Sequence, residues 1–208
     1  MKPWTKKKGI MRGTRYITQL EPLEREMLGD SAATVSEALM GRARSAPKDE
    51  LAEMTGLPSG HSTPPADPAL ARLLPSFFRD GAEEVEGEAA VTRQFTETDI
   101  IAAKLRNLRL IGEILGPDGS VHVSLSADEV QPWLTALTDI RTYHAAQLEA
   151  MEARAGEGSA DVAAATDYLE WLGYHQDSLL AAVMGPLDIP DDPDNGPDGP
   201  ESTGDGRG

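Results

Sequence analysis

The stretch SLSADEVQPWLTALTDIRTYHAAQLEAMEAR, residues 124–154, decides the fold class of this chain. Ser126 and Glu129, three residues apart, match a capping box, in which each side chain bonds the backbone of the other residue. Leu125 and Val130 stand at the two positions of a hydrophobic staple around this start. A helical period of apolar residues then continues to the end of the stretch. The pattern predicts a long amphipathic helix that needs a partner for its apolar face.

Further helices are expected on both sides of this one. Pro22 suits a first helical position, Asp67 before Pro68 is typical of an N-cap, and Thr96 with Asp99 resembles a capping box. Inside the long helix, Pro132 predicts a bend because it removes a backbone hydrogen bond. The expected helices cover 22–43, 47–54, 67–75, 97–115, 126–154 and 162–184. On the first of these, one stripe is expected to face the core: Leu23, Met27, Ser31, Val35 and Leu39.

The two ends of the chain differ from this helical body. Residues 4–20 predict a β-hairpin, since Gly9 and Gly13 bracket a turn before a run of strand-forming residues. A short strand is expected at 121–125. Residues 187–208 consist largely of Pro, Gly and Asp without periodicity, which is typical of a disordered acidic tail. We therefore predict a mainly α fold: one domain over 1–186, with about five main helices and an N-terminal hairpin.

Composition excludes several classes of function. The 208 residues contain no cysteine, which rules out disulfides, thiolate metal sites and a thiol nucleophile. No apolar run is long enough to span a membrane and none follows the basic N-terminus, so we expect a soluble cytoplasmic protein without a secretory signal. The net charge of −16 opposes loose association with nucleic acid. Residues 1–20, however, carry six basic side chains and no acidic one, so DNA contact is possible only there.

Known catalytic and metal-binding patterns are missing. The chain contains no phosphate-binding glycine loop and no nucleophile elbow. A di-metal carboxylate site needs Glu three residues before a helical His, but Arg141 precedes His144 and Leu172 precedes His175. Both histidines are therefore interpreted as packed or half-exposed helix residues with a satisfied ring nitrogen. We assign no catalytic residue, metal site or cofactor, and consider an enzyme the less favoured class.

Lysines and aromatic residues remain as candidates for binding a partner. The run 6–8, with Trp4 and Tyr16 nearby, indicates either a ribbon that contacts phosphates or a solvated hairpin whose rings cover the core. Tyr168, Trp171 and Tyr174 recur every three residues of the last helix. This spacing is typical of side chains in the core and at its edge, and a partly exposed tryptophan there would also suit an interface. The candidate partner-binding residues are Trp4, Lys6, Lys7, Lys8, Trp133 and Trp171.

Four segments in this order resemble one known family. They are PKDELAEMTG (47–56), DPALARLLPSFFRD (67–80), PWLTALTDIRT (132–142) and YLEWLGYHQDSLL (168–180), after a KPW start and an LEPLEREML helix. Over residues 2–184 the chain resembles the actinobacterial AosR-type oxidative-stress transcriptional regulators, formerly a domain of unknown function. The resemblance implies a mostly helical cytoplasmic regulator that acts on transcription with a stress sigma factor.

In the characterised branch of that family, two cysteines near the N-terminus, four residues apart, form a redox switch. The corresponding residues 4–8 of this chain contain none, which removes that sensing chemistry. Two functions stay open: a regulator that binds sigma factor or RNA polymerase, and an enzyme with an unrecognised carboxylate and histidine site. A regulator predicts exposed apolar residues near Trp133 or Trp171, whereas an enzyme predicts a closed pocket with convergent titratable groups.

Overall fold

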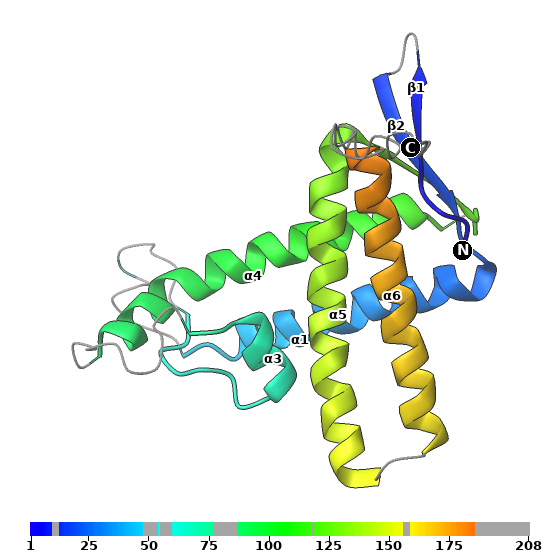
Figure 1. The fold of residues 1–208 in the computed structure, drawn as a ribbon. Helices are drawn as coiled ribbons and strands as arrows, with labels where there is room; N and C mark the ends of the chain where they lie inside the picture. Colours follow the sequence, from blue (N-terminus) through cyan, green and yellow to red (C-terminus); the bar gives the residue numbers. More distant parts are fainter. Residues whose placement is uncertain are drawn as a thin grey trace, which may run out of the picture.

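The computed structural model describes residues 1–9, 13–47, 54, 60–76, 87–117, 119–155 and 159–185. Within these ranges the chain forms five helices and three strands (Figure 1), which confirms the predicted mainly α fold with an N-terminal hairpin. The expected helix at 47–54 falls almost entirely outside the described residues, and the acidic tail at 187–208 lies wholly outside them. The elements are β1 (Thr5–Gly9), β2 (Gly13–Gln19), α1 (Pro22–Arg44), α3 (Pro68–Leu73), α4 (Glu88–Leu115), β3 (His122–Ser126), α5 (Ala127–Ala155) and α6 (Ala160–Met184).

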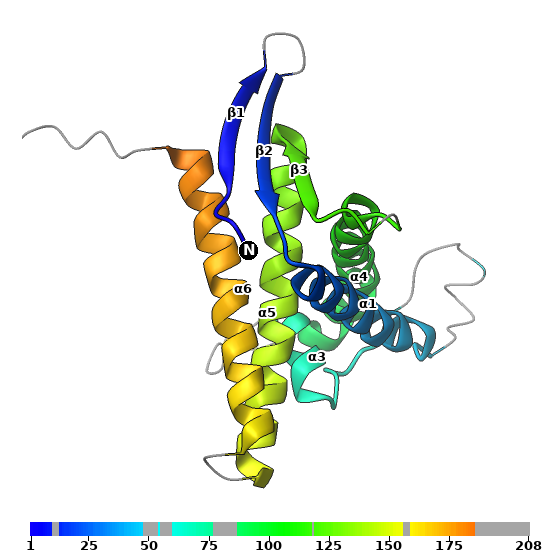
Figure 2. The same cartoon turned by 90° about the vertical axis from the view of Figure 1, so that its right-hand side faces the viewer.

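The strands form one antiparallel sheet in the order β1-β2-β3. Gly9 pairs with Gly13 at the end of the hairpin, and Gly13 has a φ of +70°, a conformation that favours glycine. β3, the strand expected from the alternation at 121–125, pairs with β2 so that Tyr16 lies opposite Leu125. The hairpin and the strand were both predicted, but their association into one sheet was not. Figure 2 shows the hairpin projecting beyond the adjacent ends of α5 and α6.

Four of the five described helices form two pairs that cross one another (Figures 1 and 2). One pair consists of α1 and α4, and the other is the hairpin of α5 and α6. α5 also contacts α1, α3, α4, β2 and β3, so it lies at the centre of the fold. The long helix predicted from residues 124–154 is therefore the one around which the other elements pack.

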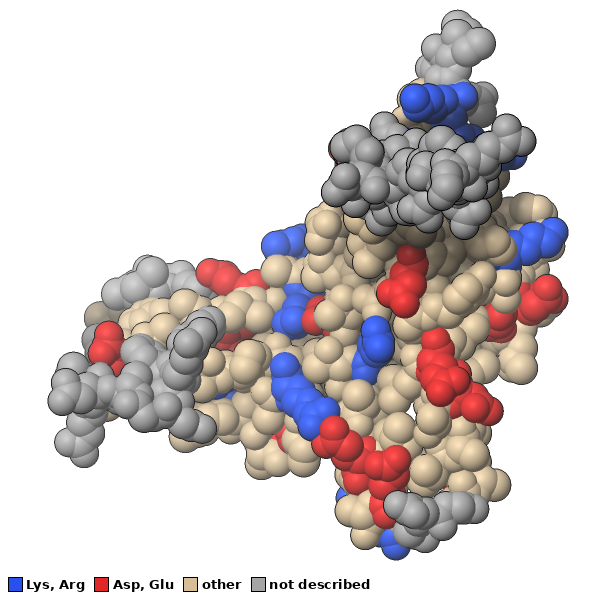
Figure 3. All heavy atoms as spheres, viewed as in Figure 1, with Lys and Arg blue, Asp and Glu red and all other residues tan. Residues whose placement is uncertain are grey.

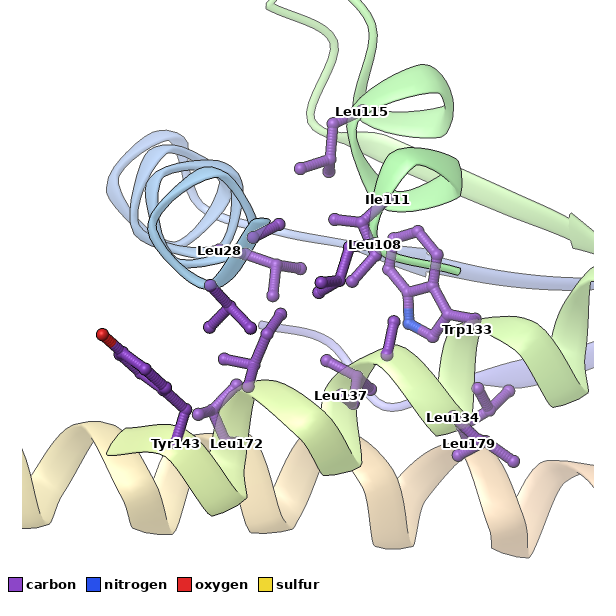
Figure 4. Close-up of a cluster of buried hydrophobic side chains, with 14 of the residues drawn as sticks. Leu28, Leu108, Ile111, Leu115, Trp133, Leu134, Leu137, Tyr143, Leu172 and Leu179 are labelled. Carbon is purple, nitrogen blue, oxygen red and sulfur yellow. The ribbon is translucent and has the colours of Figure 1, made fainter. Parts of the chain in front are cut away.

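The hydrophobic core fills the space between the two helix pairs. Figure 4 shows side chains from α1, α4, α5 and α6 converging there. Trp133 of α5 is fully buried, as are Leu28 of α1 and Ile111 of α4. Burial of a large apolar side chain stabilises the folded state by about 1.5–3 kcal/mol, so this shared core holds the pairs together.

Two of the predicted helix starts are confirmed by their caps. The backbone N–H of Ser126 donates to Glu129 Oε2 over 2.6 Å at the start of α5. Asp67 Oδ1 accepts from the backbone N–H of Leu70 over 2.9 Å at the start of α3. Pro132 lies inside α5 as expected. The bend at that position stays a prediction.

Two expectations about the helices were wrong. α4 begins at Glu88 and not near residue 97, because the polar residues read as a cap form part of the helix: Thr96 Oγ1 donates to the carbonyl of Thr92, one turn earlier. On α1, Leu23 is 65% exposed and Met27 is 37% exposed. The buried side of α1 is rotated away from them, and its members are Leu28, Ser31, Ala32, Val35 and Leu39.

Candidate functional site

Three aromatic residues from distant parts of the sequence meet at the base of the hairpin. Trp4 precedes β1, Trp133 lies on α5 and His175 on α6. The Trp4 ring lies edge-on to both others, with centroids 6.1 Å from Trp133 and 5.5 Å from His175. The backbone N–H of Trp4 also donates to Ser178 Oγ on α6 over 2.8 Å. This aromatic cluster therefore fixes the start of β1 to both long helices.

A buried hydrogen bond orders the cluster. Trp133 Nε1 donates to His175 Nε2 over 3.1 Å, so Nε2 must be unprotonated and the ring proton sits on Nδ1. His175 Nδ1 has no hydrogen-bond partner among the described residues. Burial lowers the pKa of His175 to about 3, against a smaller opposing effect of Glu24. The ring is therefore neutral at physiological pH and serves as an acceptor in the core.

The aromatic contacts continue along α6 to the start of α1. Trp171 Nε1 donates to Glu24 Oε1 over 2.8 Å, and its ring stacks on Tyr168 at 5.7 Å. Burial alone would raise the pKa of Glu24, but hydrogen bonds from the N-terminal amine, the Glu21 N–H and Trp171 outweigh it and lower this pKa. Glu24 is thus a carboxylate that ties α1 to α6.

The lysines of β1 lie above this cluster and are all exposed. Lys6 pairs with Tyr16 and its Nζ lies 5.7 Å from the centre of that ring, whereas Lys7 pairs with Arg15. Because successive residues of a strand point to opposite faces, the hairpin presents positive charge on both sides. Figure 3 shows basic side chains on this projection. β1 is also an edge strand of the described sheet, so one row of its backbone groups is free of strand pairing.

The structure separates the candidate residues into two groups. Trp4 and Trp133 are 4% and 0% exposed, so neither side chain reaches a partner at the surface. Of the two places where a regulator predicts exposed apolar residues, the one near Trp171 has Tyr174 at 49% exposed. Trp4 and Tyr16 cover the core, as one of the two alternatives for the hairpin expected, because Tyr16 is 6% exposed. Contact of the lysines with a partner stays a prediction. Trp171 is half-buried, at the edge of the core. Lysines 6–8 remain as surface groups.

A buried ion cluster that the sequence analysis missed ties together α1, α3 and α4. Glu97 accepts from Arg42 Nε over 2.7 Å and from Arg93 Nη1 over 2.8 Å. Arg93 also donates to the carbonyls of Leu74 and Pro75, each over 3.1 Å. Burial would raise the pKa of Glu97, but the two guanidinium groups lower it. The spacing of four between Arg93 and Glu97 was visible in the sequence, whereas Arg42 is 55 residues away from Glu97 and was not predictable.

The described residues form several hollows with charged side chains in their linings. One of about 230 Å³ is lined by Leu73, Ile100, Arg93, Glu97 and Lys104, among other residues. Its charged groups already have partners: Arg93 and Glu97 bond each other, and Lys104 pairs with Asp139 over 2.5 Å. As expected, Asp139 and Arg141 pair elsewhere and not with each other, since Arg141 bonds Gln176. The charged side chains that line this hollow are therefore already held in ion pairs.

The described ranges hold neither a cluster of metal ligands nor a membrane-spanning helix. They contain no group of three His, Asp or Glu side chains that could hold a metal ion. None of their helices is both long and apolar enough to cross a bilayer. Cysteine is absent from the whole sequence.

Comparison with known proteins identifies the family. The model of a domain of unknown function, DUF2017, matches residues 1–183. This chain belongs to the DUF2017 family. The match includes all the described helices and strands and leaves out only the last residue of α6. The described fold is therefore the DUF2017 fold. No solved structure matches the chain.

Named relatives of this DUF2017 chain occur in mycobacteria. It is 32% identical over 185 residues to the oxidative stress regulator AosR of Mycobacterium tuberculosis and to that of Mycobacterium bovis, covering 83% of this chain and 84% of each relative. A putative oxidative stress regulator AosR of Mycobacterium leprae is 27% identical over 184 residues, with the same coverage. The resemblance to the AosR-type family is confirmed, and these relatives are named as oxidative stress regulators.

Proposed function

We propose that this protein is a non-enzymatic cytoplasmic regulator of transcription that binds a protein partner through its basic β-hairpin. The names of its relatives support the regulatory role. RNA polymerase or a stress sigma factor is the partner that the family resemblance implies. With no cysteine in the chain, regulation cannot depend on a disulfide of its own.

The observation that carries this proposal is the anchoring of an exposed lysine strand on a buried tryptophan. Trp4 holds the start of β1 in the core, so the following three lysines are displayed on a fixed support. A pre-organised surface loses less conformational entropy on binding than a flexible tail. An edge strand can also accept an extended segment of a partner as an added strand. An acidic, extended segment of the partner fits both the charge and the free edge.

The test compares two variants with equal changes in charge. Lys6→Glu/Lys7→Glu/Lys8→Glu changes the hairpin, and Arg106→Glu/Arg109→Glu/Arg154→Glu changes exposed positions on α4 and α5 by the same total. Binding of the full chain to purified RNA polymerase holoenzyme and to the isolated stress sigma factor would be measured by interferometry. We expect the hairpin variant to lose binding at least tenfold and the control to change less than threefold.

Other results would overturn the proposal. Absence of binding by the wild-type chain would remove these partners. Equal binding by both variants would assign the lysines to the ordinary role of edge-strand lysines, which is to prevent pairing between sheets of different molecules. Salt-dependent binding of the wild type to a DNA duplex, lost in the hairpin variant, would replace the protein partner with DNA.

A further inference from the structure

Two exposed apolar residues of α1 have no role in the core. Leu23 and Met27 are 65% and 37% exposed, and their spacing of four makes them neighbours on one side of the helix. Such a pair is ordinary on its own, whereas a larger contiguous apolar patch marks an interaction site. Their position relative to α6 shows how far this apolar surface extends.

The same surface continues across the seam between α1 and α6. Tyr168 donates its hydroxyl to Ser31 Oγ over 2.7 Å, and that hydroxyl lies 3.4 Å from the backbone carbonyl of Met27. Next along α6, Trp171 bonds Glu24, the residue between Leu23 and Arg25. Tyr174, three residues further, is 49% exposed. We call this surface the seam patch, made of Leu23, Met27, Tyr168, Trp171 and Tyr174.

Two of the three rings of the seam patch are held in fixed positions. Tyr168 and Trp171 stack with an angle of 17° between their planes, and each has its polar atom bonded to α1. Tryptophan, tyrosine and methionine are enriched in the centres of protein interfaces, where they bury much area for little lost entropy. Met27 adds an adaptable apolar side chain. The patch therefore has the composition and the rigidity of a docking surface.

The charges around the patch define its partner. α6 carries Asp161, Asp167, Glu170 and Asp177 and no lysine or arginine. On α1, Glu26 and Asp30 are exposed, while Arg25 is occupied by the carbonyl of Leu115 over 2.8 Å. Figure 3 shows acidic side chains spaced along the α6 side of the molecule. A second copy that docked with the same patch would bring these acids together, which a chain of net charge −16 disfavours.

We propose that the seam patch is the docking site for a basic amphipathic segment of a partner protein, with apolar anchors flanked by Lys or Arg. The apolar anchors cover the Leu23 and Met27 stripe and the exposed edge of Trp171. The flanking cations face Asp30 and Asp167 on the two sides of the seam. The proposal deepens the proposed function as a protein-binding regulator, but it uses a surface of opposite charge to the hairpin. One partner could therefore be held at two places, an acidic segment at the hairpin and a basic one at the seam.

The probe is a synthetic helical peptide of Leu and Lys, 18 residues long, with the leucines on one face. Two matched peptides replace either Lys by Glu or Leu by Ser. Binding to the full chain would be followed by fluorescence anisotropy. We expect the Leu/Lys peptide to bind at least tenfold more tightly than either matched peptide. Equal binding of the Ser/Lys peptide would reduce the effect to general charge attraction, and equal binding of the Leu/Glu peptide would refute the charge argument.

Variants of the protein locate the binding. Leu23→Ser/Met27→Ser removes the apolar stripe, and Val91→Ser/Phe95→Ser is its control, since those α4 residues have the same spacing and are 53% and 51% exposed. We expect about tenfold weaker peptide binding, 1.4 kcal/mol, for the first variant and less than twofold for the control. Equal losses in both would refute the seam as the site.

A second variant leaves the apolar residues intact. Asp30→Lys/Asp167→Lys should weaken the Leu/Lys peptide at least tenfold, and unchanged binding would refute the role of the acidic rim. The hairpin variant Lys6→Glu/Lys7→Glu/Lys8→Glu should keep peptide binding, so failure of the hairpin proposal and failure of this one are distinguishable. A dimer in sedimentation that Leu23→Ser/Met27→Ser abolishes would replace the partner protein with a second copy of the chain.

Discussion

The indole nitrogen of Trp133 donates to Nε2 of His175 over 3.1 Å between two fully buried side chains, and this bond joins the two long helices beneath the hairpin. The residues are 42 positions apart in the sequence. Trp133→Phe removes the donor and leaves the histidine without its bond. Since a buried polar group without a partner costs about 1–3 kcal/mol, we expect chemical denaturation to show a loss in that range. A loss below about 0.5 kcal/mol would mean that the bond does not contribute to stability.

Stability should fall as the pH drops below about 6.5, because His175 has a pKa of about 3 in the folded chain. Between these two pKa values His175 binds a proton in the unfolded state and not in the folded state, so acid favours unfolding. The expected slope is about 1.4 kcal/mol per pH unit for this one proton. His175→Gln keeps an acceptor for Trp133 and should flatten the slope by that amount between pH 6.5 and 5. His144 adds dependence of the same sign, since burial also lowers its pKa, but it is present in both proteins and cancels in the comparison.

The Glu97 cluster should contribute strongly to stability. Glu97→Gln leaves Arg42 and Arg93 without their carboxylate in the interior, and breaking a buried pair in this way costs about 3–5 kcal/mol. Glu113→Gln is the control, because Glu113 pairs with Arg109 at the surface and such a pair is worth about 0.3–0.5 kcal/mol. Denaturant titrations of both variants would measure the difference. Similar losses of unfolding free energy in the two variants would show that the buried cluster stabilises the fold no more than a surface ion pair.

Peroxide should modify this protein only at methionine, because it has no thiol. Met27 and Met184 are 37% and 69% exposed, so their conversion to sulfoxides should occur without loss of core packing. We expect mass spectrometry to show oxidation at both sites with an unchanged melting temperature. A response of the purified protein that dithiothreitol reverses would contradict this account.

Deleting residues 187–208 should leave the melting temperature nearly unchanged, as its Pro, Gly and Asp content buries little apolar surface. The segment has a net charge of −6, from seven acidic residues and one basic residue. The segment follows α6 in the sequence, and α6 contacts β1 of the hairpin. At low salt, its removal should therefore strengthen binding of an acidic partner to the hairpin. A drop of several degrees in melting temperature would indicate that this segment packs on the body.

Local chemistry explains why much of the fold could be predicted from the sequence. The capping pair of Ser126 and Glu129, the cap at Asp67 and the glycines around the hairpin turn act within a few residues, so their signals can be read directly. The start of α4 was misplaced because threonine and aspartate suit both a cap and a helix interior, and the neighbouring residues decide between them.

Only the tertiary structure decided which surfaces are free. The sequence determined that the chain is helical, that its N-terminus is basic and that it holds no cysteine. It could not determine that Trp133 is buried, that Met27 is exposed, or that Arg42 meets Glu97. Each of these depends on how α1 and α6 are rotated against the central helix α5. Side chains that are far apart in the sequence pack into one core, and this packing sets the rotation of the helices. No local sequence pattern predicts it.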